Sequence, residues 1–316
     1  MSSYDAKIVG AGSWGRALAH ILSQNKKKVL IYSRSPGREY STKNISQTHN
    51  INDIFLNDSP IIIATPVNTL SEIGKVMKKN NFPGVVALAC KGIDLALGLF
   101  PSEIICEYIN SEKIAVLSGP SFAEEVINNH PTAVTLASSN EDTLNIFADM
   151  FHSKFFRVYL SDDMIGCQIG GAMKNILSVA VGISDGLGLG PNAKAALITR
   201  GIIEIKTLGE TLKCSEKTVY GLSGLGDLVL TSNDNLSRNR RFGIEIAKGL
   251  SVAEAEKKIG QVVEGIYASK GLNVLIQKYS LNLPICSKVF DIINEKISPK
   301  EAVNDLLIRT QKKEFV

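Results

Sequence analysis

A glycine motif close to the N-terminus constrains the fold of this 316-residue chain more than any other feature. The motif, GAGSWG, overlaps the end of the apolar run Ala6–Gly10 and opens a helical stretch. In such a strand–turn–helix unit, Gly10 permits the tight turn, Gly12 lets the backbone approach a pyrophosphate, and Gly15 lets helix and strand pack closely. Backbone N–H groups at the start of the helix would then bind the anion. Alone the pattern also fits an ordinary glycine turn, so its meaning depends on the elements that follow.

Those elements alternate between short apolar runs and amphipathic stretches. We expect strands at Ala6–Gly10, Lys28–Tyr32, Pro60–Ala64, Val85–Cys90, Ile114–Leu117, Ala133–Ala137 and Phe155–Leu160. We expect helices among them at Trp14–Asn25, Asn68–Asn80 and Glu141–Phe151. Single helices between strands predict parallel pairing through βαβ crossovers. The expected fold class is therefore α/β, beginning with a Rossmann-type doubly wound sheet that helices cover on both faces.

After residue 161 the helical period dominates the sequence. Helices are expected at Met164–Ser184, Ala193–Lys213, Arg238–Lys248, Val252–Lys258, Ile266–Tyr279, Ser287–Lys296 and Pro299–Thr310. The chain is thus expected to divide into a dinucleotide-binding domain, residues 1–161, and an all-α substrate-binding domain, residues 162–316. A ligand cleft would lie between them, at the carboxyl ends of the strands.

Composition and charge argue against several classes of protein. With 35 basic and 31 acidic side chains the formal net charge is +4, too small to indicate a nucleic-acid or membrane surface by itself. No stretch approaches the roughly 18 uninterrupted apolar residues of a membrane span, and the N-terminus lacks the features of a signal peptide. The five cysteines are scattered without a Cys-x-x-Cys pair, and the four histidines show no ligand spacing. We expect no disulfide framework, no metal and a cytoplasmic location.

The end of the second expected strand bears on the choice of dinucleotide. An acidic residue there would accept a hydrogen bond from the ribose 2′-hydroxyl of NAD. Residues 32–35 read YSRS, without an acid, and Arg34 could instead pair with a 2′-phosphate and stack on adenine. We therefore expect NADP(H) to be preferred and NAD(H) to be possible. The alternative is a solvated loop arginine.

Three segments place reactive groups at the expected cleft. Lys91 follows the strand Val85–Cys90, and the stretch SGPSFA at residues 118–123 follows the next strand with a hydroxyl and turn backbone. The stretch GGAMKN puts Lys174 in an otherwise apolar helix, where the two glycines clear space for something to approach. Burial would lower the pKa of this lysine and suit it to proton transfer. A structural salt bridge is the alternative.

A fourth segment combines GLGDL at residues 224–228 with NLSRNRRF at residues 235–242. Ser237 is placed as an N-cap, so its helix would present free N–H groups beside Arg238 and Asn239. That combination suits a phosphomonoester. The charge run could also be a nucleic-acid patch, but it is one short cluster without interleaved aromatic residues.

These motifs, in this order, resemble the bacterial NAD(P)-dependent glycerol-3-phosphate dehydrogenases. The matching stretches are GAGSWG, CKG, SGPSFAEE, FRVY, IGCQIGGAMKNILSVAVGISDGLGLGPNAKAALITRG, GLSGLGDLVLTSNDNLSRNRRFG and IGQVVEG. They cover most of the chain, and those in the second half are the most specific. The resemblance implies reversible hydride transfer between NAD(P)H and dihydroxyacetone phosphate, giving sn-glycerol 3-phosphate for phospholipid synthesis.

The resemblance also implies roles for the matching residues. Lys174 would be the general acid/base at the C2 oxygen and Lys91 would contact both ligands, while Asp227 could orient Lys174. Substrate contacts are implied for Lys91, Gly119, Ser121, Lys174, Asp227, Ser237, Arg238 and Asn239. With the motif glycines Gly10, Gly12 and Gly15, the residues expected to line the dinucleotide are Ser13, Trp14, Arg34, Lys91, Ala123, Arg238, Val262 and Glu264.

Two features depart from the family's pattern. The stretch between Arg34 and the strand at Pro60 is shorter than expected, and Ser35–Asn57 has many polar residues and little apolar period. The adenine-side wall is therefore expected to be abbreviated or mobile. Cys90 stands where Thr or a similar small residue is expected. Beside Lys91 its thiolate would be favoured and oxidisable; the alternative is a packed, unreactive thiol.

Two other functions stay open on the sequence. A related two-domain dehydrogenase could act on a β-hydroxyacid, 6-phosphogluconate or an acyl-CoA, although the SRNRR segment favours a small phosphate ester. A non-catalytic protein on the same scaffold would have no need of Lys91, Lys174, Asp227 and Arg238 together. Self-association as a homodimer is expected through the helical second domain.

Overall fold

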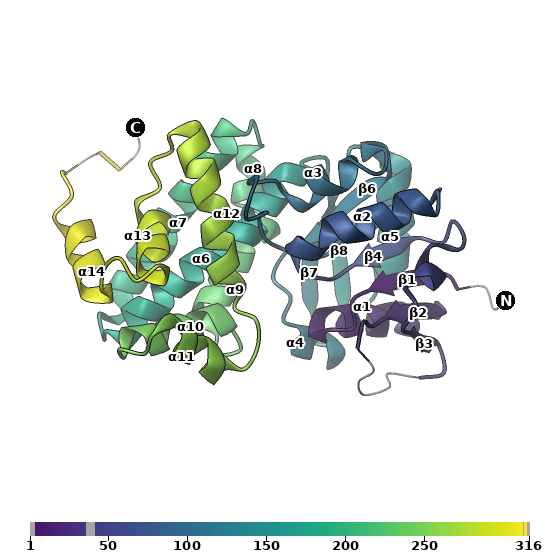
Figure 1. The fold of residues 1–316 in the computed structure, drawn as a ribbon, viewed down its shortest axis with the longest axis horizontal. Helices are drawn as coiled ribbons and strands as arrows, with labels where there is room; N and C mark the ends of the chain where they lie inside the picture. The colour runs from purple at the N-terminus through teal and green to yellow at the C-terminus, as the bar shows by residue number, and fades with distance from the viewer. Residues whose placement is uncertain (1–3, 36–41, 312, 315–316) are drawn as a thin grey trace.

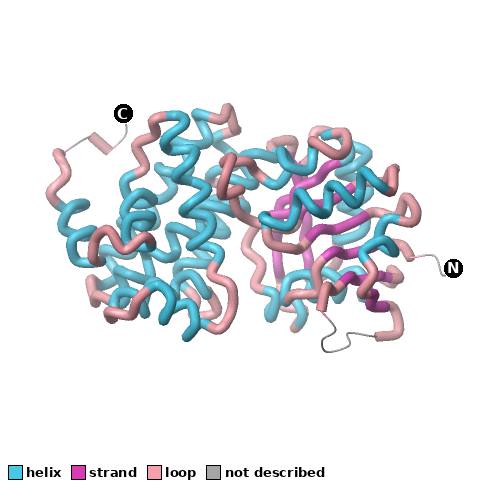
Figure 2. Tube along the Cα trace, in the orientation of Figure 1, coloured by secondary structure: helices cyan, strands magenta, loops and turns pink. Residues whose placement is uncertain are grey.

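The computed structural model describes residues 4–35, 42–311 and 313–314. In this part of the chain, the strands gather in the N-terminal half and the C-terminal half is helical (Figures 1 and 2). The arrangement confirms a Rossmann-type domain followed by an all-α domain. Part of the segment expected to be abbreviated, residues 36–41, lies outside the described residues.

The sheet of the N-terminal half has eight strands among the described residues, in the order β3-β2-β1-β4-β5-β6-β7-β8. Their bounds are β1 Ala6–Val9, β2 Val29–Tyr32, β3 Ile45–Thr48, β4 Ile61–Ile63, β5 Val86–Leu88, β6 Ile114–Ser118, β7 Thr132–Ala137 and β8 Phe156–Ser161. The central strands β1, β4 and β5 are buried throughout, and their residues are apolar except for Lys7 on β1, as expected when helices cover both faces of a parallel sheet.

The helices of this half flank the sheet (Figure 1). They are α1 Ser13–Gln24, α2 Leu70–Lys79, α3 Pro101–Cys106, α4 Ala123–Ile127 and α5 Glu141–Phe151, with short 3₁₀ turns at Ile51–Phe55, Val67–Thr69 and Ser111–Lys113. The short helices α3 and α4 were not expected from the sequence, because five or six residues show too little apolar periodicity.

Strand β7 corrects the expectation of parallel pairing throughout. It runs antiparallel to β6, with Leu117 opposite Leu136, and parallel to β8. A parallel crossover needs about a dozen residues or more and usually a full helix. The connection after β6 contains only the five-residue α4, so the chain turns back beside the strand that it has just left.

The segment after Arg34 also holds more structure than its polar sequence indicates. Sequence reasoning assigns it no element, yet β3 pairs with β2 and is followed by the 3₁₀ turn Ile51–Phe55. Lys7 on β1 is 2% exposed, and its Nζ donates hydrogen bonds to the Ile54 carbonyl at 3.0 Å and Asn57 Oδ1 at 2.6 Å. One buried lysine therefore fastens this segment to the sheet.

The C-terminal half consists of helices packed around α6. They are α6 Met164–Gly186, α7 Gly190–Thr211, α8 Glu216–Val219, α9 Asp227–Asn233, α10 Arg238–Ala247, α11 Val252–Ile259, α12 Glu264–Tyr279, α13 Pro284–Ile293 and α14 Pro299–Leu307, with a π turn at Leu222–Gly226. By length and mean hydropathy α6 is long and apolar enough to cross a membrane, although Lys174 and Asn175 interrupt its apolar run, as expected from the sequence. However, 83% of its 18-residue apolar window is buried inside the protein, as in a core helix.

The cores of the two halves exchange residues. Ile93 and Phe100 come from the first half of the chain but are buried in the core of the helical half. In return, Cys167 on α6 is buried in a core cluster of the sheet half. The packing is thus continuous across the junction at which the sequence places the domain boundary.

Candidate active site

The glycine turn between β1 and α1 is shaped to receive an anion. Gly10 has a φ of +111°, and a Cβ on Gly15 would lie 1.8 Å from the Gly10 carbonyl oxygen, so both positions require glycine. A Cβ on Gly12 would meet nothing within 4 Å, and Gly12 caps α1 without a side-chain hydrogen bond. Open space therefore lies before the uncapped N–H groups of α1, which fits a dinucleotide pyrophosphate.

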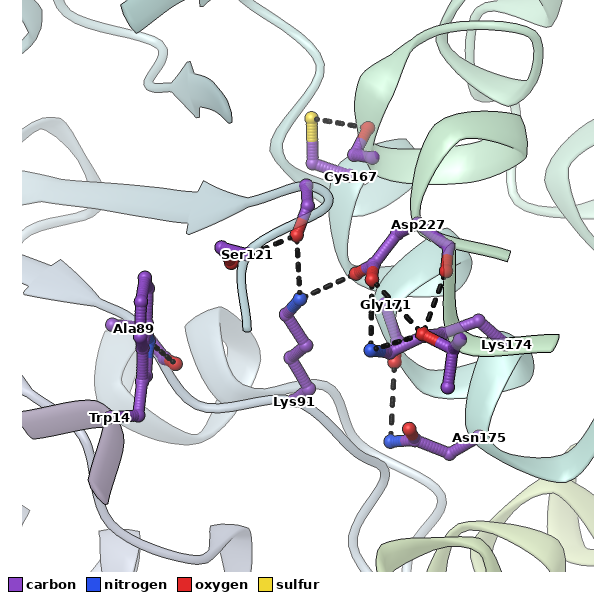
Figure 3. A network of polar contacts seen from close by, with 12 residues as sticks. Trp14, Ala89, Lys91, Ser121, Cys167, Gly171, Lys174, Asn175 and Asp227 are labelled. Carbon is purple, nitrogen blue, oxygen red and sulfur yellow. Dashed lines mark hydrogen bonds and ion pairs between the residues drawn. The ribbon is translucent and has the colours of Figure 1, made fainter. Parts of the chain in front are cut away.

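Trp14 connects this turn to the rest of the site. Its indole N–H donates to the Ala89 carbonyl at 3.1 Å, two residues before Lys91 (Figure 3). Arg34 lies exposed just beyond the end of β2, where an adenosine 2′-substituent would be met. The start of the helix and the strand end that carries the first lysine are therefore held together.

Lys91, Lys174 and Asp227 meet where the two halves join (Figure 3). Lys174 Nζ lies 2.8 Å from Asp227 Oδ1, and Lys91 forms an ion pair with the other carboxylate oxygen. Lys91 also donates to the Gly119 carbonyl at 3.0 Å, and Ser121 Oγ donates to the same oxygen at 3.1 Å. Five of the residues singled out from the sequence thus form one network.

The cluster has an excess of positive charge in a largely dehydrated place. The Asp227 side chain is 1% exposed, whereas the two lysines are 12–14% exposed. Burial alone would raise the pKa of Asp227, but the two ammonium groups outweigh burial and hold that pKa below its ordinary value. Burial lowers the pKa of Lys91 despite the neighbouring carboxylate. The two cations and one anion leave a net positive charge facing the anionic ligands expected here.

The two small residues before Lys174 bring protein, rather than ligand, against α6. A Cβ on Gly170 would lie 2.2 Å from the Ser223 carbonyl oxygen, and a Cβ on Gly171 would lie 3.0 Å from Ser118 Oγ. These glycines therefore let the turn before Asp227 and the end of β6 approach closely. This refines the sequence interpretation, in which the glycines leave room for an unspecified group.

Sequence reasoning missed Thr231. Its hydroxyl accepts a hydrogen bond from Lys174 Nζ at 3.0 Å and donates to the Asp227 carbonyl at 2.7 Å. Asp227 and Thr231 are four residues apart on α9, so both face Lys174. That spacing in GDLVLT is the signal that could have identified it.

A second polar group lies next to the lysines and joins three helices. Asn175 Nδ2 donates to Glu264 Oε2 at 3.0 Å, and Asn239 Nδ2 donates to Asn175 Oδ1 at 2.8 Å. Asn239 Oδ1 in turn accepts from the Gly265 N–H at 2.9 Å. The candidate residues Asn239 and Glu264 are thus connected to the neighbour of Lys174, a link that the sequence did not indicate.

The start of α10 has the geometry of an anion site. Ser237 Oγ accepts a hydrogen bond from the Arg240 N–H at 3.2 Å, which confirms the predicted N-cap. Arg238 is half-buried and has no hydrogen-bond or ion-pair partner among the described residues. An available guanidinium therefore stands at a helix N-terminus, one residue from Asn239.

The Cys90 thiol is unreactive in this setting. It is 8% exposed, and burial raises its pKa to about 12. The structure therefore favours the packed thiol over the thiolate that its position beside Lys91 suggested.

The remaining candidate residues lie at the starts of helices: Ala123 begins α4, and Val262 is 48% exposed just before α12. Among the described residues no group of three or more His, Cys, Asp or Glu side chains could hold a metal ion.

Profiles of known protein families match both halves of the chain. The C-terminus of NAD-dependent glycerol-3-phosphate dehydrogenase matches residues 163–304, and the N-terminus of the same enzyme matches residues 5–61 and 36–144. The chain belongs to the NAD-dependent glycerol-3-phosphate dehydrogenase family. This confirms the resemblance drawn from the motifs.

Individual members of the glycerol-3-phosphate dehydrogenase family are similar over nearly their whole length. A relative from Halothermothrix orenii, named glycerol-3-phosphate dehydrogenase [NAD(P)+], is 40% identical and the match covers 98% of this chain and 96% of the relative. One of the same name from Legionella pneumophila is 39% identical, with 99% and 100% covered. The crystal structure of glycerol-3-phosphate dehydrogenase from Coxiella burnetii superposes with a TM-score of 0.91 at 37% identity, covering 97% of this chain and 99% of that one.

Proposed function

We propose that this protein catalyses the reversible NAD(P)H-dependent reduction of dihydroxyacetone phosphate to sn-glycerol 3-phosphate. The observation that carries the proposal is the buried Lys91–Asp227–Lys174 cluster, placed between an anion-binding glycine turn and a helix N-terminus with a free arginine. Reduction of a ketone develops negative charge on its oxygen and requires a proton. The two lysines can supply the charge and the proton without a metal.

Lys174 is the proposed proton donor in the reductive direction. Bound NAD(P)H supplies the hydride that reaches C2 of the ketone. Lys174 gives a proton to the C2 oxygen and recovers one from solvent, while Lys91 stabilises the developing negative charge. Asp227 and Thr231 orient Lys174, since both contact its Nζ within 3.0 Å. In the oxidative direction the neutral amine of Lys174 takes the proton back.

The phosphate of the substrate is proposed to bind at the start of α10. Ser237, Arg238 and Asn239 combine a capped helix N-terminus with an unpaired guanidinium, and charge-assisted hydrogen bonds of this kind suit a phosphomonoester. Gly119 and Ser121, beside Lys91, are proposed to contact the rest of the substrate.

The dinucleotide is proposed to lie along the carboxyl edge of the sheet. Gly10, Gly12 and Gly15 shape its turn, and the remaining residues proposed to line it are Ser13, Trp14, Arg34, Lys91, Ala123, Arg238, Val262 and Glu264. The uncapped N–H groups of α1 and the open space at Gly12 support this placement. Arg34 and the missing acid after β2 favour NADP(H), with NAD(H) also accepted.

Three further properties belong to this proposal. The chain divides between residues 161 and 162, in the connection between β8 and α6. The protein acts in the cytoplasm, where its product feeds phospholipid synthesis. It forms a homodimer through the helical half.

A turnover assay of the purified protein tests the proposed function directly. Oxidation of NADPH and of NADH is followed with dihydroxyacetone phosphate and, in parallel, with β-keto acid and acyl-CoA substrates. We expect turnover with dihydroxyacetone phosphate and a higher kcat/KM for NADPH. Turnover only with another ketone would replace the substrate, and dinucleotide binding without turnover would identify a non-catalytic member of the family.

A further inference from the structure

The segment that follows Lys91 leaves the sheet and docks on the helical half. Residues 92–100, which we call the strap, begin at Gly92 with a φ of +141° and lead into α3. Ile93 and Phe100 are 3% and 1% exposed in the core of the helical half. Lys91 is therefore the last residue before a segment that places Ile93 and Phe100 in the core of the other half.

The strap has a defined shape of its own. Asp94 Oδ1 accepts hydrogen bonds from the Ala96 N–H at 3.0 Å and the Leu97 N–H at 2.8 Å. The Asp94 N–H donates to the Leu99 carbonyl at 2.8 Å, which closes the loop at its base. We expect a loop closed in this way to shift as a unit, so that a displacement where it docks on the helical half also displaces Lys91, the residue directly before it.

Two residues of the helical half hold this part of the chain, Gly271 at the start of the strap and Gln168 at Ser102 in α3, two residues after the strap ends. On α12, a Cβ on Gly271 would lie 2.8 Å from both the Cβ and the carbonyl oxygen of Ile93, so only a glycine lets the strap backbone lie this close. On α6, Gln168 accepts from the Ser102 N–H and donates to Ser102 Oγ, both at 2.8 Å. Neither Gly271 nor Gln168 is hydrogen-bonded to the lysines or to Asp227 among the described residues.

We propose that Gly271 and Gln168 are positioning residues that set the place of the Lys91 ammonium relative to Asp227 and Lys174. The inference rests on the proposed function, because it concerns the same lysine. Helix α12 begins at Glu264, which belongs to the asparagine network, and Gly271 lies two turns further along it. One helix thus supports both the proposed cofactor side of the site and the lysine that contacts the substrate.

The test is the substitution Gly271→Ala, made in the wild-type protein and in the Lys91→Ala variant, with kcat measured for each. Alanine favours the helix, so a loss cannot come from helix propensity. We expect kcat to fall by about 10²-fold, since a misplacement of about 1 Å can cost that much, while NADPH affinity stays within about threefold. If Gly271 acts through Lys91, Gly271→Ala adds no further loss when Lys91 is already alanine.

Gly186→Ala is the matched control. A Cβ there would lie 2.7 Å from Ala247 Cβ and 2.8 Å from the Ile244 carbonyl oxygen, a similar clash at the far end of α6. It should lower the free energy of unfolding without the loss in kcat. If Gly271→Ala does not fold, Gln168→Leu takes its place, with kcat measured for Gln168→Leu alone and combined with Lys91→Ala. Gln168→Glu should have a higher kcat than Gln168→Leu, because glutamate keeps an acceptor for the Ser102 N–H.

The pH profile separates positioning from general destabilisation. Lys91 is faced by Asp227, Lys174 and Glu264, and burial lowers its pKa. Displacement toward water should raise that pKa and shift the alkaline limb of kcat to higher pH. The positioning role would be overturned if the losses in kcat from Gly271→Ala and Lys91→Ala were additive in the double variant. It would also be overturned if the alkaline limb of the kcat profile did not move in Gly271→Ala. A Lys91→Ala variant that retains wild-type kcat would instead refute the proposed function.

Discussion

Asp227 and Lys174 are 53 residues apart in sequence, and their side chains join α9 to α6 through a contact of 2.8 Å. The other oxygen of the carboxylate is occupied by the ammonium of Lys91. A single carboxylate therefore aligns two cations from different halves of the chain.

Lys174→Ala should remove the proton donor and leave the dinucleotide site intact. General acid catalysis contributes about 10²–10⁴-fold, so kcat for dihydroxyacetone phosphate should fall by that amount. The Kd for NADPH, followed by its fluorescence, should change little. Lys206→Ala on the surface of α7, which breaks an exposed pair with Glu216, is the control. Turnover within a few-fold of wild type would exclude Lys174 as the acid.

Asp227→Asn should cost both stability and activity. It leaves two largely buried ammonium groups without their carboxylate, and breaking a buried pair in this way costs about 3–5 kcal/mol. Urea unfolding measures the loss. Asp305→Asn, which breaks an exposed ion pair with Lys288, should cost no more than about 1 kcal/mol.

Acidification offers a second measure of the same residue. The folded pKa of Asp227 lies below its ordinary value, so the unfolded chain binds the proton first as the pH falls. The stabilisation from Asp227 is complete above the unfolded pKa of about 3.9 and is lost as the pH falls through the lower folded pKa. Asp227→Asn should lose this part of the acid dependence. Identical acid unfolding curves for both proteins would argue against it.

Alkaline pH should report on Lys91. Because burial lowers its pKa, the folded protein releases this proton at a lower pH than the unfolded chain does. Its burial therefore costs stability at neutral pH, and the cost is relieved as the pH rises through the folded pKa. The rate of reduction should fall over the same range, as the charge on Lys91 is lost. The arginine of Lys91→Arg stays charged, so the fall in the rate of reduction should move to higher pH if the geometry is retained. If Lys91→Arg remains active and its rate of reduction falls at the same alkaline pH as in the wild type, the fall is caused by the titration of another group.

Arg34→Ser should distinguish the two dinucleotides. We expect the Kd for NADPH to rise by about tenfold or more, as for loss of a hydrogen bond to a charged group worth about 1.5–3 kcal/mol. The Kd for NADH should stay nearly constant, because NADH lacks the 2′-phosphate. Equal effects on both dinucleotides would mean that Arg34 does not recognise that phosphate.

Lys7→Met should loosen the segment between β3 and β4. The substitution leaves the buried Ile54 carbonyl without its donor, which costs about 1–3 kcal/mol. Hydrogen exchange should speed up around Ile51–Phe55. Lys75→Met on the exposed face of α2 serves as the control. Unchanged exchange would show that β3 alone holds the segment.

The sequence predicts the parts of the site that lie at the ends of regular elements. Gly10 to Gly15 and Lys91 follow strands, so their place at the carboxyl edge of the sheet follows from the βαβ pattern. Ser237 could be placed at the start of a helix in the second half, because serine is a preferred N-cap residue. Lys174 could be placed on a long apolar helix by its period alone. The catalytic roles of Lys91 and Lys174 are implied by the family resemblance, and the structure shows that both lysines contact Asp227.

What could not be predicted depends on contacts between distant segments. The antiparallel pairing of β7 follows from the shortness of α4, which has no distinct periodicity. The order of the segment around β3 depends on Lys7, whose burial no local pattern reveals. Thr231 and Gly271 matter through what packs against them, and glycine or threonine in a helix is compatible with many surroundings.

The exchange of Ile93 and Cys167 between the cores has a consequence for engineering. A hybrid enzyme that takes residues 1–161 from one homologue and the remainder from another would combine two sets of surfaces that never co-evolved. A crossover that transfers residues 92–102 together with the C-terminal half keeps Ile93, Phe100 and Ser102 with their neighbours in that half, and leaves Ile104 and Ile105 in the core of the sheet half. Hybrids of this second kind should express and fold more often.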